Sequence, residues 1–196
     1  MDAAPSARMT EPTYYYRGIP EIDGGDGVWD VDCRWPEVEA HADLRPDDHV
    51  LDVGCAEGLI TIEIAQRVKH VHGVELRSQR VEAARKIAAE RGVSNVTFEQ
   101  GSIDQLLLAP QSYDVVLFLG VLQHLPAQAQ FPSLAKVLGA ARRQVLMRMP
   151  IFDNRFPTRL TGVAFTCQQF GYRLTVLPQR ERWMGNMLIA DRVEQR

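Results

Sequence analysis

The sequence predicts an α/β fold built around a mainly parallel sheet. From His49 onward, short apolar runs rich in β-branched residues alternate with longer stretches of helical periodicity, which is the pattern of βαβ units. A glycine-containing turn directly follows the first run, and two extended segments lie near the end of the chain. With 196 residues, 45% of them hydrophobic, we expect one core and one main domain rather than two.

The alternating pattern locates each element. Predicted strands cover residues 49–53, 70–75, 96–100, 113–119 and 144–149, and predicted helices cover residues 58–68, 78–91, 103–107 and 126–140. In the second helix, Val81, Ala84 and Ile87 recur at the spacing that buries one helix face. Ser78 is a suitable N-cap for this helix and Gly92 a suitable stop.

The two ends of the chain differ from this middle part. After Pro150 we expect a loop, a short apolar helix ending near Gly171, and two extended segments at 173–177 and 187–191 that pair antiparallel. Residues 1–44 are rich in aromatic residues and glycine. This N-terminal segment is interpreted either as a cap over a pocket mouth or as a packing arm along the sheet, and residues 45–196 as the main domain.

Charge and cysteine content exclude several classes of protein. The formal net charge is -3 and the pI is about 6.0, so no general basic field draws the chain to nucleic acid or anionic lipid. The three cysteines are odd in number and widely spaced, which favours a reducing compartment over a disulfide framework. With no secretory or membrane-spanning run, we expect a cytoplasmic protein, and no residue spacing calls for a metal.

A cofactor-binding pattern follows the first predicted strand. The strand leads into Gly54-Cys55-Ala56-Glu57-Gly58, where glycines permit a tight turn and let a ligand approach the main chain. Glu75 stands 21 residues after Gly54, at the end of the second strand, which suits an acid that binds two ribose hydroxyls. The order of strand, glycine turn, helix, strand and acid therefore predicts a crevice for a nucleoside cofactor.

The charge of this turn indicates which cofactor it accepts. A pyrophosphate would sit at the helix N-terminus, but Asp52 and Glu57 place carboxylates there and would repel it. A ligand with an ammonium group and a sulfonium centre suits those carboxylates, and its own carboxylate can use main-chain N–H groups or an arginine. The pattern favours S-adenosylmethionine over a dinucleotide.

Four motifs in register resemble those of the class I S-adenosylmethionine-dependent methyltransferases. They are residues 50–58, Glu75 with its neighbours, residues 100–103 and residues 113–125, and the resemblance covers about residues 50–191. It implies a Rossmann-like, doubly wound sheet of seven strands, with helices on both faces and the last strand antiparallel between strands five and six.

The resemblance also implies the residues that bind S-adenosylmethionine. They lie at the ends of the first four strands: Asp52, Gly54, Cys55, Ala56, Gly58, Glu75, Leu76, Gly101, Ser102, Ile103, Leu119 and Gly120. Two of them depart from the family pattern. Ala56 replaces the usual middle glycine of the turn, and Ser102 replaces the adenine-contacting acid, so the adenine amino group is expected to meet Ser102, Asp104 or the main chain.

The remaining candidates concern methyl transfer and the acceptor. His124 follows the fourth strand and is the best candidate for a general base, although a histidine there can also hold the loop. Arg148, Arg155 and Arg159 are hypothesised to bind a carboxylate or phosphate of the acceptor, the alternative being solvated arginines. In the N-terminal segment, Tyr16 and Trp29 could stack on a planar acceptor or close over the cofactor.

Together these patterns predict a methyltransferase that acts on oxygen or nitrogen of a small, potentially anionic metabolite, because the domain has little additional bulk to bind a macromolecule. The alternatives are an RNA methyltransferase, which normally shows a basic face or an added binding module, and a regulatory subunit that binds the cofactor without turnover. We do not expect nucleic-acid or membrane partners, and the oligomeric state is a monomer or a homodimer.

Overall fold

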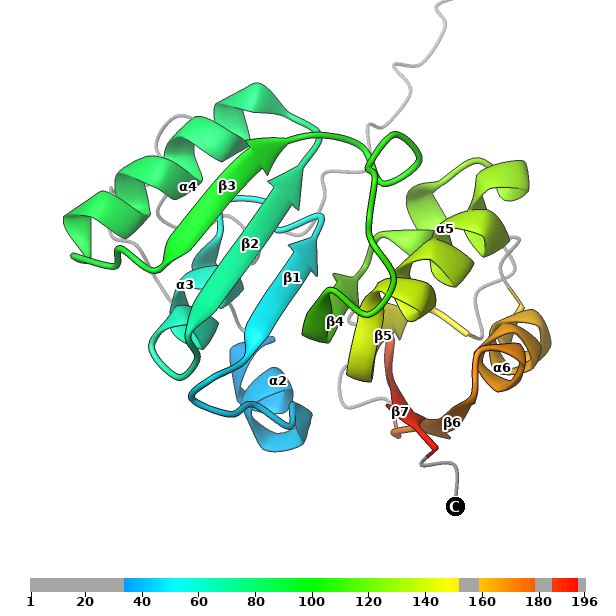
Figure 1. Cartoon of the computed structure of the whole chain (residues 1–196). Coiled ribbons are helices and arrows are strands. Elements are labelled where there is room, and N and C mark those ends of the chain that lie inside the picture. The colour runs from blue at the N-terminus through cyan, green and yellow to red at the C-terminus, as the bar shows by residue number, and fades with distance from the viewer. Residues whose placement is uncertain (1–33, 152–158, 179–184, 194–196) are drawn as a thin grey trace, which may run out of the picture.

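The computed structural model describes residues 34–151, 159–178 and 185–193, and these residues form one sheet in the order β3-β2-β1-β4-β5-β7-β6 (Figure 1). Its strands are β1 (His49–Val53), β2 (His70–Glu75), β3 (Val96–Gln100), β4 (Tyr113–Leu119), β5 (Ala141–Met149), β6 (Tyr172–Val176) and β7 (Asn186–Arg192). The helices are α2 (Trp35–His41), α3 (Leu59–Ala65), α4 (Ser78–Glu90), α5 (Ala127–Ala140) and α6 (Leu160–Gln169), with a 3₁₀ turn η2 (Leu122–His124). None of these helices has the length and apolar character needed to span a bilayer.

Strand pairing confirms the predicted topology. β1 to β5 pair in parallel, with Asp52 opposite Gly73 on one side and opposite Leu117 on the other. β7 pairs antiparallel with both β5 and β6, so the last strand lies between the fifth and sixth strands. The carboxyl ends of five parallel strands consequently meet at one edge of the sheet.

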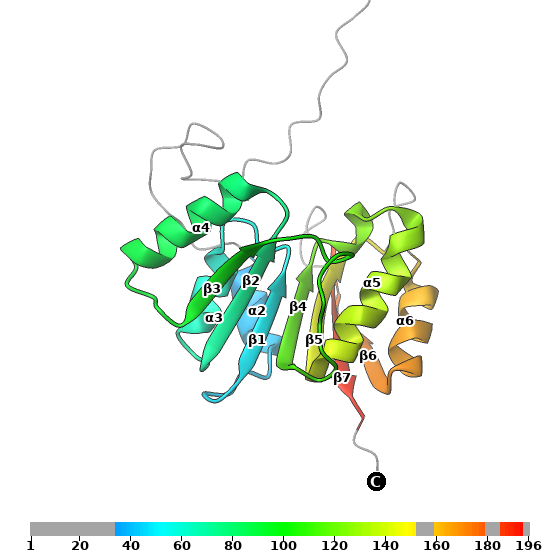
Figure 2. The same ribbon diagram turned by 45° about the horizontal axis from the view of Figure 1, so that its top comes forward.

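Helices cover both faces of the sheet (Figures 1 and 2). Alternate strand residues divide between two cores, as the pleat requires. Val116 and Phe118 of β4 pack in the core with α5 and α6, whereas Val115 and Leu117 pack in the core with α2 and α3. α4 covers the β2–β3 end of the second face, where its apolar side contacts Phe98. The predicted doubly wound arrangement is confirmed.

The ends of α3 and α4 differ slightly from the sequence prediction. α3 ends at Ala65 rather than at residue 68, and the side-chain amide of Asn95 donates to the carbonyls of Ala65 (2.7 Å) and Val68 (3.0 Å) in the segment that follows. The N-cap of α4 is Arg77, and Ser78 is its first helical residue. At the other end, the prediction for Gly92 is confirmed, since it adopts φ +68° and donates to the carbonyl of Ala89.

The predicted helix at residues 103–107 is absent. These residues form a turn and then an extended loop. The ammonium group of Lys136, on α5, accounts for this difference: it donates to the carbonyls of Ile103 (2.7 Å), Asp104 (2.9 Å) and Leu106 (2.9 Å). The loop meets its hydrogen-bonding requirement through a residue 30 or more positions later in the chain.

The N-terminal boundary of the packed domain lies earlier than residue 45. α2 contributes Trp35 and Val38 to the core shared with α3, so residues 35–41 are part of the same packed body. α2 also carries Glu37, whose buried carboxylate forms an ion pair with Arg148 of β5. Residues 1–33 lie outside the described residues, and their predicted role as a cap or arm stays a prediction.

Candidate cofactor and active site

The loop between β1 and α3 has the backbone conformation that its glycines predict. Gly54 and Gly58 both have φ +74° and Ala56 has φ +50°, all in the left-handed region that favours glycine. A Cβ at Gly54 would lie 2.4 Å from a methyl group of Val121. The loop after β1 and the loop after β4 therefore approach one another closely, and only glycine fits at this contact.

Glu75 links the end of β2 to this loop. Its carboxylate accepts hydrogen bonds from the main-chain N–H of Ala56 (3.2 Å) and from that of Arg77 (2.9 Å). The Glu75 residue is 8% exposed, and a carboxylate can accept about four hydrogen bonds. The side chain is fixed in position by two contacts and keeps acceptor capacity for a ligand.

The two other carboxylates of the motif are buried and have partners within the fold. Asp52 accepts a hydrogen bond from the hydroxyl of Thr61 at 2.6 Å, which joins β1 to α3. Glu57 forms an ion pair with Arg80 of α4 at 3.1 Å. Burial raises the pKa of Glu57, and the charge of Arg80 opposes this effect. Both acids hold the loop in place, a role that their positions in the sequence do not reveal.

The ends of β2 and β3 form the next part of this edge. The N–H of Gly101 donates to the carbonyl of Glu75 at 3.0 Å, and the Leu76 side chain, next along the chain, is 63% exposed. Ser102 donates a short hydrogen bond to Asp104, and this bond lowers the pKa of the Asp104 carboxyl. An exposed apolar residue and a polar pair thus follow neighbouring parallel strands at the same edge, an arrangement that suits a flat, partly polar base.

The segment after β4 carries the candidate base. Gly120 has φ +72° and donates its N–H to the carbonyl of Arg148 at 3.0 Å, while Leu119 is buried. His124 ends the turn η2 and is exposed. The side chain therefore lies at the carboxyl edge of the sheet, the edge that carries the Gly54 loop.

The structure does not support Arg148 as part of an acceptor-binding cluster. Its side chain is 4% exposed, and its guanidinium pairs with the buried carboxylate of Glu37 and donates to the carbonyl of Gly185 at 3.4 Å. Arg159, in contrast, is exposed at the start of α6. Arg155 lies outside the described residues, as do Tyr16 and Trp29, and the roles assigned to these residues stay predictions.

Both described cysteines are free thiols buried in the fold. Burial raises the pKa of the Cys55 thiol well above its usual value, with Asp52 and Glu75 adding to the effect. Burial also raises the pKa of Cys167 to about 11, so both thiols stay protonated near neutrality. Among the described residues, no group of three or more His, Cys, Asp or Glu side chains could hold a metal ion.

Three contacts of this edge escaped the sequence analysis: Thr61 on Asp52, the main chain of Arg77 on Glu75, and Lys136 on the 103–106 loop. Thr61 and Arg77 lie close in the sequence to the cofactor-binding motif. Hydroxyl and N–H donors near Asp52 and Glu75 are therefore a signal that could have indicated these two contacts. No local signal indicates Lys136.

The sheet topology and the loop define a nucleoside-binding α/β domain of the Rossmann-like type. Residues 44–160 match the family model described as a methyltransferase domain. The chain belongs to this family, and its fold is that of the class I S-adenosylmethionine-dependent methyltransferases.

Curated relatives include enzymes with different acceptors. The chain is 36% identical over 162 residues to a ubiquinone biosynthesis O-methyltransferase of Hahella chejuensis, an alignment that covers 77% of this chain and 65% of the relative. It is 34% identical over 137 residues to a 23S rRNA (uracil(1939)-C(5))-methyltransferase of Klebsiella pneumoniae, covering 67% of this chain and 29% of the relative. The chain thus spans less than two thirds of each relative's length.

Solved structures with low sequence identity share the fold. The magnesium protoporphyrin IX methyltransferase of Synechocystis with bound SAH has a TM-score of 0.68 at 22% identity, with 81% of this chain and 80% of that chain covered. A methyltransferase of Mesorhizobium loti also has a TM-score of 0.68, at 15% identity, covering 81% and 97% of the two chains. These likenesses confirm the predicted Rossmann-like architecture.

Proposed function

We propose that this chain transfers the methyl group of S-adenosylmethionine to an oxygen or nitrogen of a small metabolite. The observation that carries the proposal is the fixed carboxylate of Glu75 beside the left-handed loop at Gly54 and Ala56. Support for a small acceptor comes from the O-methyltransferase relative, which aligns with a larger share of this chain than the rRNA enzyme does.

The residues at this edge fit the chemistry of the cofactor. Glu75 uses two hydrogen bonds to hold itself and has acceptor capacity for ribose hydroxyls, which are donors. The exposed Leu76 offers an apolar surface for adenine, and Ser102 with Asp104 offers polar contacts for its edge.

When bound, S-adenosylmethionine supplies a methyl carbon that is already activated by the sulfonium. The chain's task is to align the acceptor in line with that carbon, to exclude water and, for a hydroxyl or ammonium acceptor, to remove a proton. His124 is the proposed base because imidazole accepts protons near neutral pH and the residue lies at the carboxyl edge of the sheet.

The acceptor is proposed to carry a carboxylate or phosphate, bound by Arg159 and Arg155 after β5, with Tyr16 and Trp29 stacking on a planar part of the molecule. Arg148 is not part of this set, because its guanidinium pairs with the buried carboxylate of Glu37. RNA is the second candidate acceptor, favoured by the similarity to the rRNA enzyme. The net charge of -3 disfavours it.

Calorimetry and a methyl-transfer assay test the proposal. The full chain is expected to bind S-adenosylhomocysteine and to transfer labelled methyl from S-adenosylmethionine to members of a panel of phenols, quinols and aromatic carboxylates, but not to rRNA transcripts. Absence of cofactor binding by folded protein would overturn the assignment, and transfer to rRNA alone would overturn the choice of acceptor. Binding of the cofactor without methyl transfer to the small molecules or to the rRNA transcripts would instead indicate a regulatory subunit.

Two variants test the assigned residues in the same assay. His124→Ala is expected to lower kcat at unchanged stability, and nearly full turnover would remove the histidine as base. Replacing Arg155 and Arg159 by Ala is expected to raise the acceptor's KM strongly with little change in cofactor affinity. An unchanged KM would remove the arginines from acceptor binding.

A further inference from the structure

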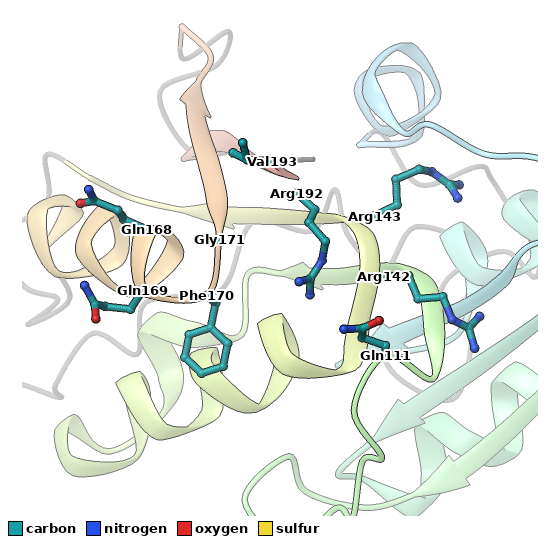
Figure 3. A pocket seen from close by; sticks show the side chains of 9 residues that line it. All are labelled: Gln111, Arg142, Arg143, Gln168, Gln169, Phe170, Gly171, Arg192 and Val193. Atoms are coloured by element: carbon teal, nitrogen blue, oxygen red, sulfur yellow. The ribbon is translucent and has the colours of Figure 1, made fainter. Parts of the chain in front are cut away.

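A cavity opens at the edge of the sheet opposite the Gly54 loop. It has a volume of about 740 Å³ and lies where β5 begins and where the antiparallel β7 ends (Figure 3). Three arginines and three glutamines line it: Arg142, Arg143, Arg192, Gln111, Gln168 and Gln169. Among the described residues, no acidic side chain lines this cavity, which we call the arginine pocket.

The three arginines differ in how their charge is balanced. Arg142 forms an ion pair with Asp114 at 3.1 Å, and Arg143 forms one with Asp43 at 2.7 Å. Arg192 donates from Nη2 to two neutral groups, the carbonyl of Ala141 and the hydroxyl of Tyr172. Within the described ranges, no carboxylate forms an ion pair with Arg192, so no acidic side chain there competes with a ligand for this guanidinium.

The orientation of Arg192 is fixed. Its hydrogen bonds to Ala141 (2.8 Å) and Tyr172 (2.9 Å) hold one guanidinium nitrogen, and the group stacks on the Tyr172 ring with 4.6 Å between the guanidinium carbon and the ring centroid. Its Nε is buried and has no hydrogen-bond partner in the described part of the chain. In Figure 3, the guanidinium extends toward Gln111 and Phe170, whereas Arg143 extends away from them.

The other walls of the pocket indicate the shape of a ligand. Gln111 has φ +49°, an uncommon conformation for a non-glycine residue, and its N–H is held by the carbonyl of Gly139 at 2.9 Å. Such strained positions persist only where the surrounding structure enforces them, and they cluster at functional sites. Phe170 is 37% exposed and contributes an apolar surface. A pre-oriented cation, side-chain amides and an aromatic ring thus surround the same opening.

We propose that the arginine pocket binds a small molecule that carries an oxyanion, a carboxylate or a phosphate, on an aromatic body. Arg192 would bind the oxyanion, because guanidinium groups form charge-assisted hydrogen bonds with such groups. The side-chain amide of Gln111 would donate or accept a hydrogen bond at the rim of the arginine pocket. The ring of Phe170 would cover the aromatic body of the ligand. This site is independent of the proposed methyl transfer, since it lies at the other edge of the sheet.

Titration of isotope-labelled full-length protein, followed by amide chemical shifts, tests the proposal. Phenyl phosphate and benzoate distinguish phosphate from carboxylate, and inorganic phosphate tests whether the aromatic body matters. Saturable shifts are expected at Gln111, Gly171 and Val193 with at least one aromatic ligand. The proposal is overturned if neither aromatic ligand binds, if the shifts fall instead near Glu75, or if inorganic phosphate binds as tightly as phenyl phosphate.

A matched pair of variants gives a second test. Arg192→Gln is expected to weaken binding about tenfold or more, the usual effect of losing one charge-assisted hydrogen bond. Arg85→Gln is the control, because Arg85 also donates to a main-chain carbonyl, that of Phe98, but on α4 and far from the pocket. Equal affinities for Arg192→Gln and Arg85→Gln would contradict the proposal. If Arg192→Gln does not fold, the wild-type titration alone tests the proposal, through whether the chemical-shift changes fall at Gln111, Gly171 and Val193.

Discussion

The carboxylate of Glu75 accepts a hydrogen bond from the main-chain N–H of Ala56 at 3.2 Å. This contact joins the end of β2 to the loop after β1, and the second carboxylate oxygen takes the N–H of Arg77. The acid therefore has two functions: it holds the left-handed conformation of the loop, and it is the proposed acceptor for ribose hydroxyls.

Glu75→Gln is expected to lower the affinity for S-adenosylhomocysteine about tenfold or more, because hydrogen bonds to a charged group are each worth about 1.5–3 kcal/mol. The amide NH₂ would also face one of the two main-chain N–H donors and leave it without an acceptor. Calorimetry measures the effect, with Glu82→Gln, an exposed acid on α4, as control. Unchanged affinity in Glu75→Gln would remove this residue from the cofactor site.

Lys136→Met is expected to release the loop that carries Ser102 and Asp104. Three carbonyls lose their shared donor, which we expect to reduce the free energy of unfolding by about 1–3 kcal/mol. Hydrogen exchange at the amides of residues 103–107 should accelerate, and cofactor affinity should fall with it. Lys69→Met, at an exposed site, is the control. Unchanged exchange at these amides would show that Lys136 does not hold the loop.

Arg148→Met leaves the Glu37 carboxylate buried without its cation. Removal of one partner of a buried ion pair typically costs about 3–5 kcal/mol, so urea unfolding should show a loss of this order. The double variant with Glu37→Leu is expected to recover much of the loss, because neither charge is then buried alone. Additive losses in this double-mutant cycle would mean that the pair is not coupled.

The contrast between Glu75 and Arg148 shows what the sequence could predict. Glu75 follows a strand at a fixed distance from a glycine loop, so local pattern alone placed it at the site. Arg148 also ends a strand, but its partner Glu37 lies 111 positions earlier in the chain, and nothing near Arg148 indicates that its charge is already balanced. Apolar periodicity indicates which residues are buried, and this was enough to predict the sheet. It does not indicate which polar groups are partners, so it could not predict the pair of Arg148 and Glu37.

The missing helix at residues 103–107 has a similar cause. Its local composition permits a helix, but Lys136 binds three carbonyls of the loop, while Leu106 and Leu108 pack against the core beneath α5 and α6. Tertiary contacts therefore override a weak local preference. The conformation of the loop next to the proposed adenine site depends on a side chain from another element, which a single sequence does not reveal.

Glu57 gives a prediction about pH. Burial raises its pKa above the usual 4.5, and Arg80 only partly offsets this. Between 4.5 and the raised value, the folded chain holds more protons at this site than the unfolded chain does. The contribution of Glu57 to stability is therefore fully present below about pH 4.5 and is lost as the pH rises through the folded-state pKa.

Glu57→Gln removes this proton linkage. The free energy of unfolding of the wild type, minus that of Glu57→Gln, is accordingly expected to decrease as the pH is raised from 4.5 toward neutrality. Urea unfolding at a series of pH values measures this difference, and Glu82→Gln, at an exposed site, should give a nearly flat profile. A difference that instead increases with pH would mean that Arg80 outweighs desolvation and that the charged form of Glu57 is the stabilising one.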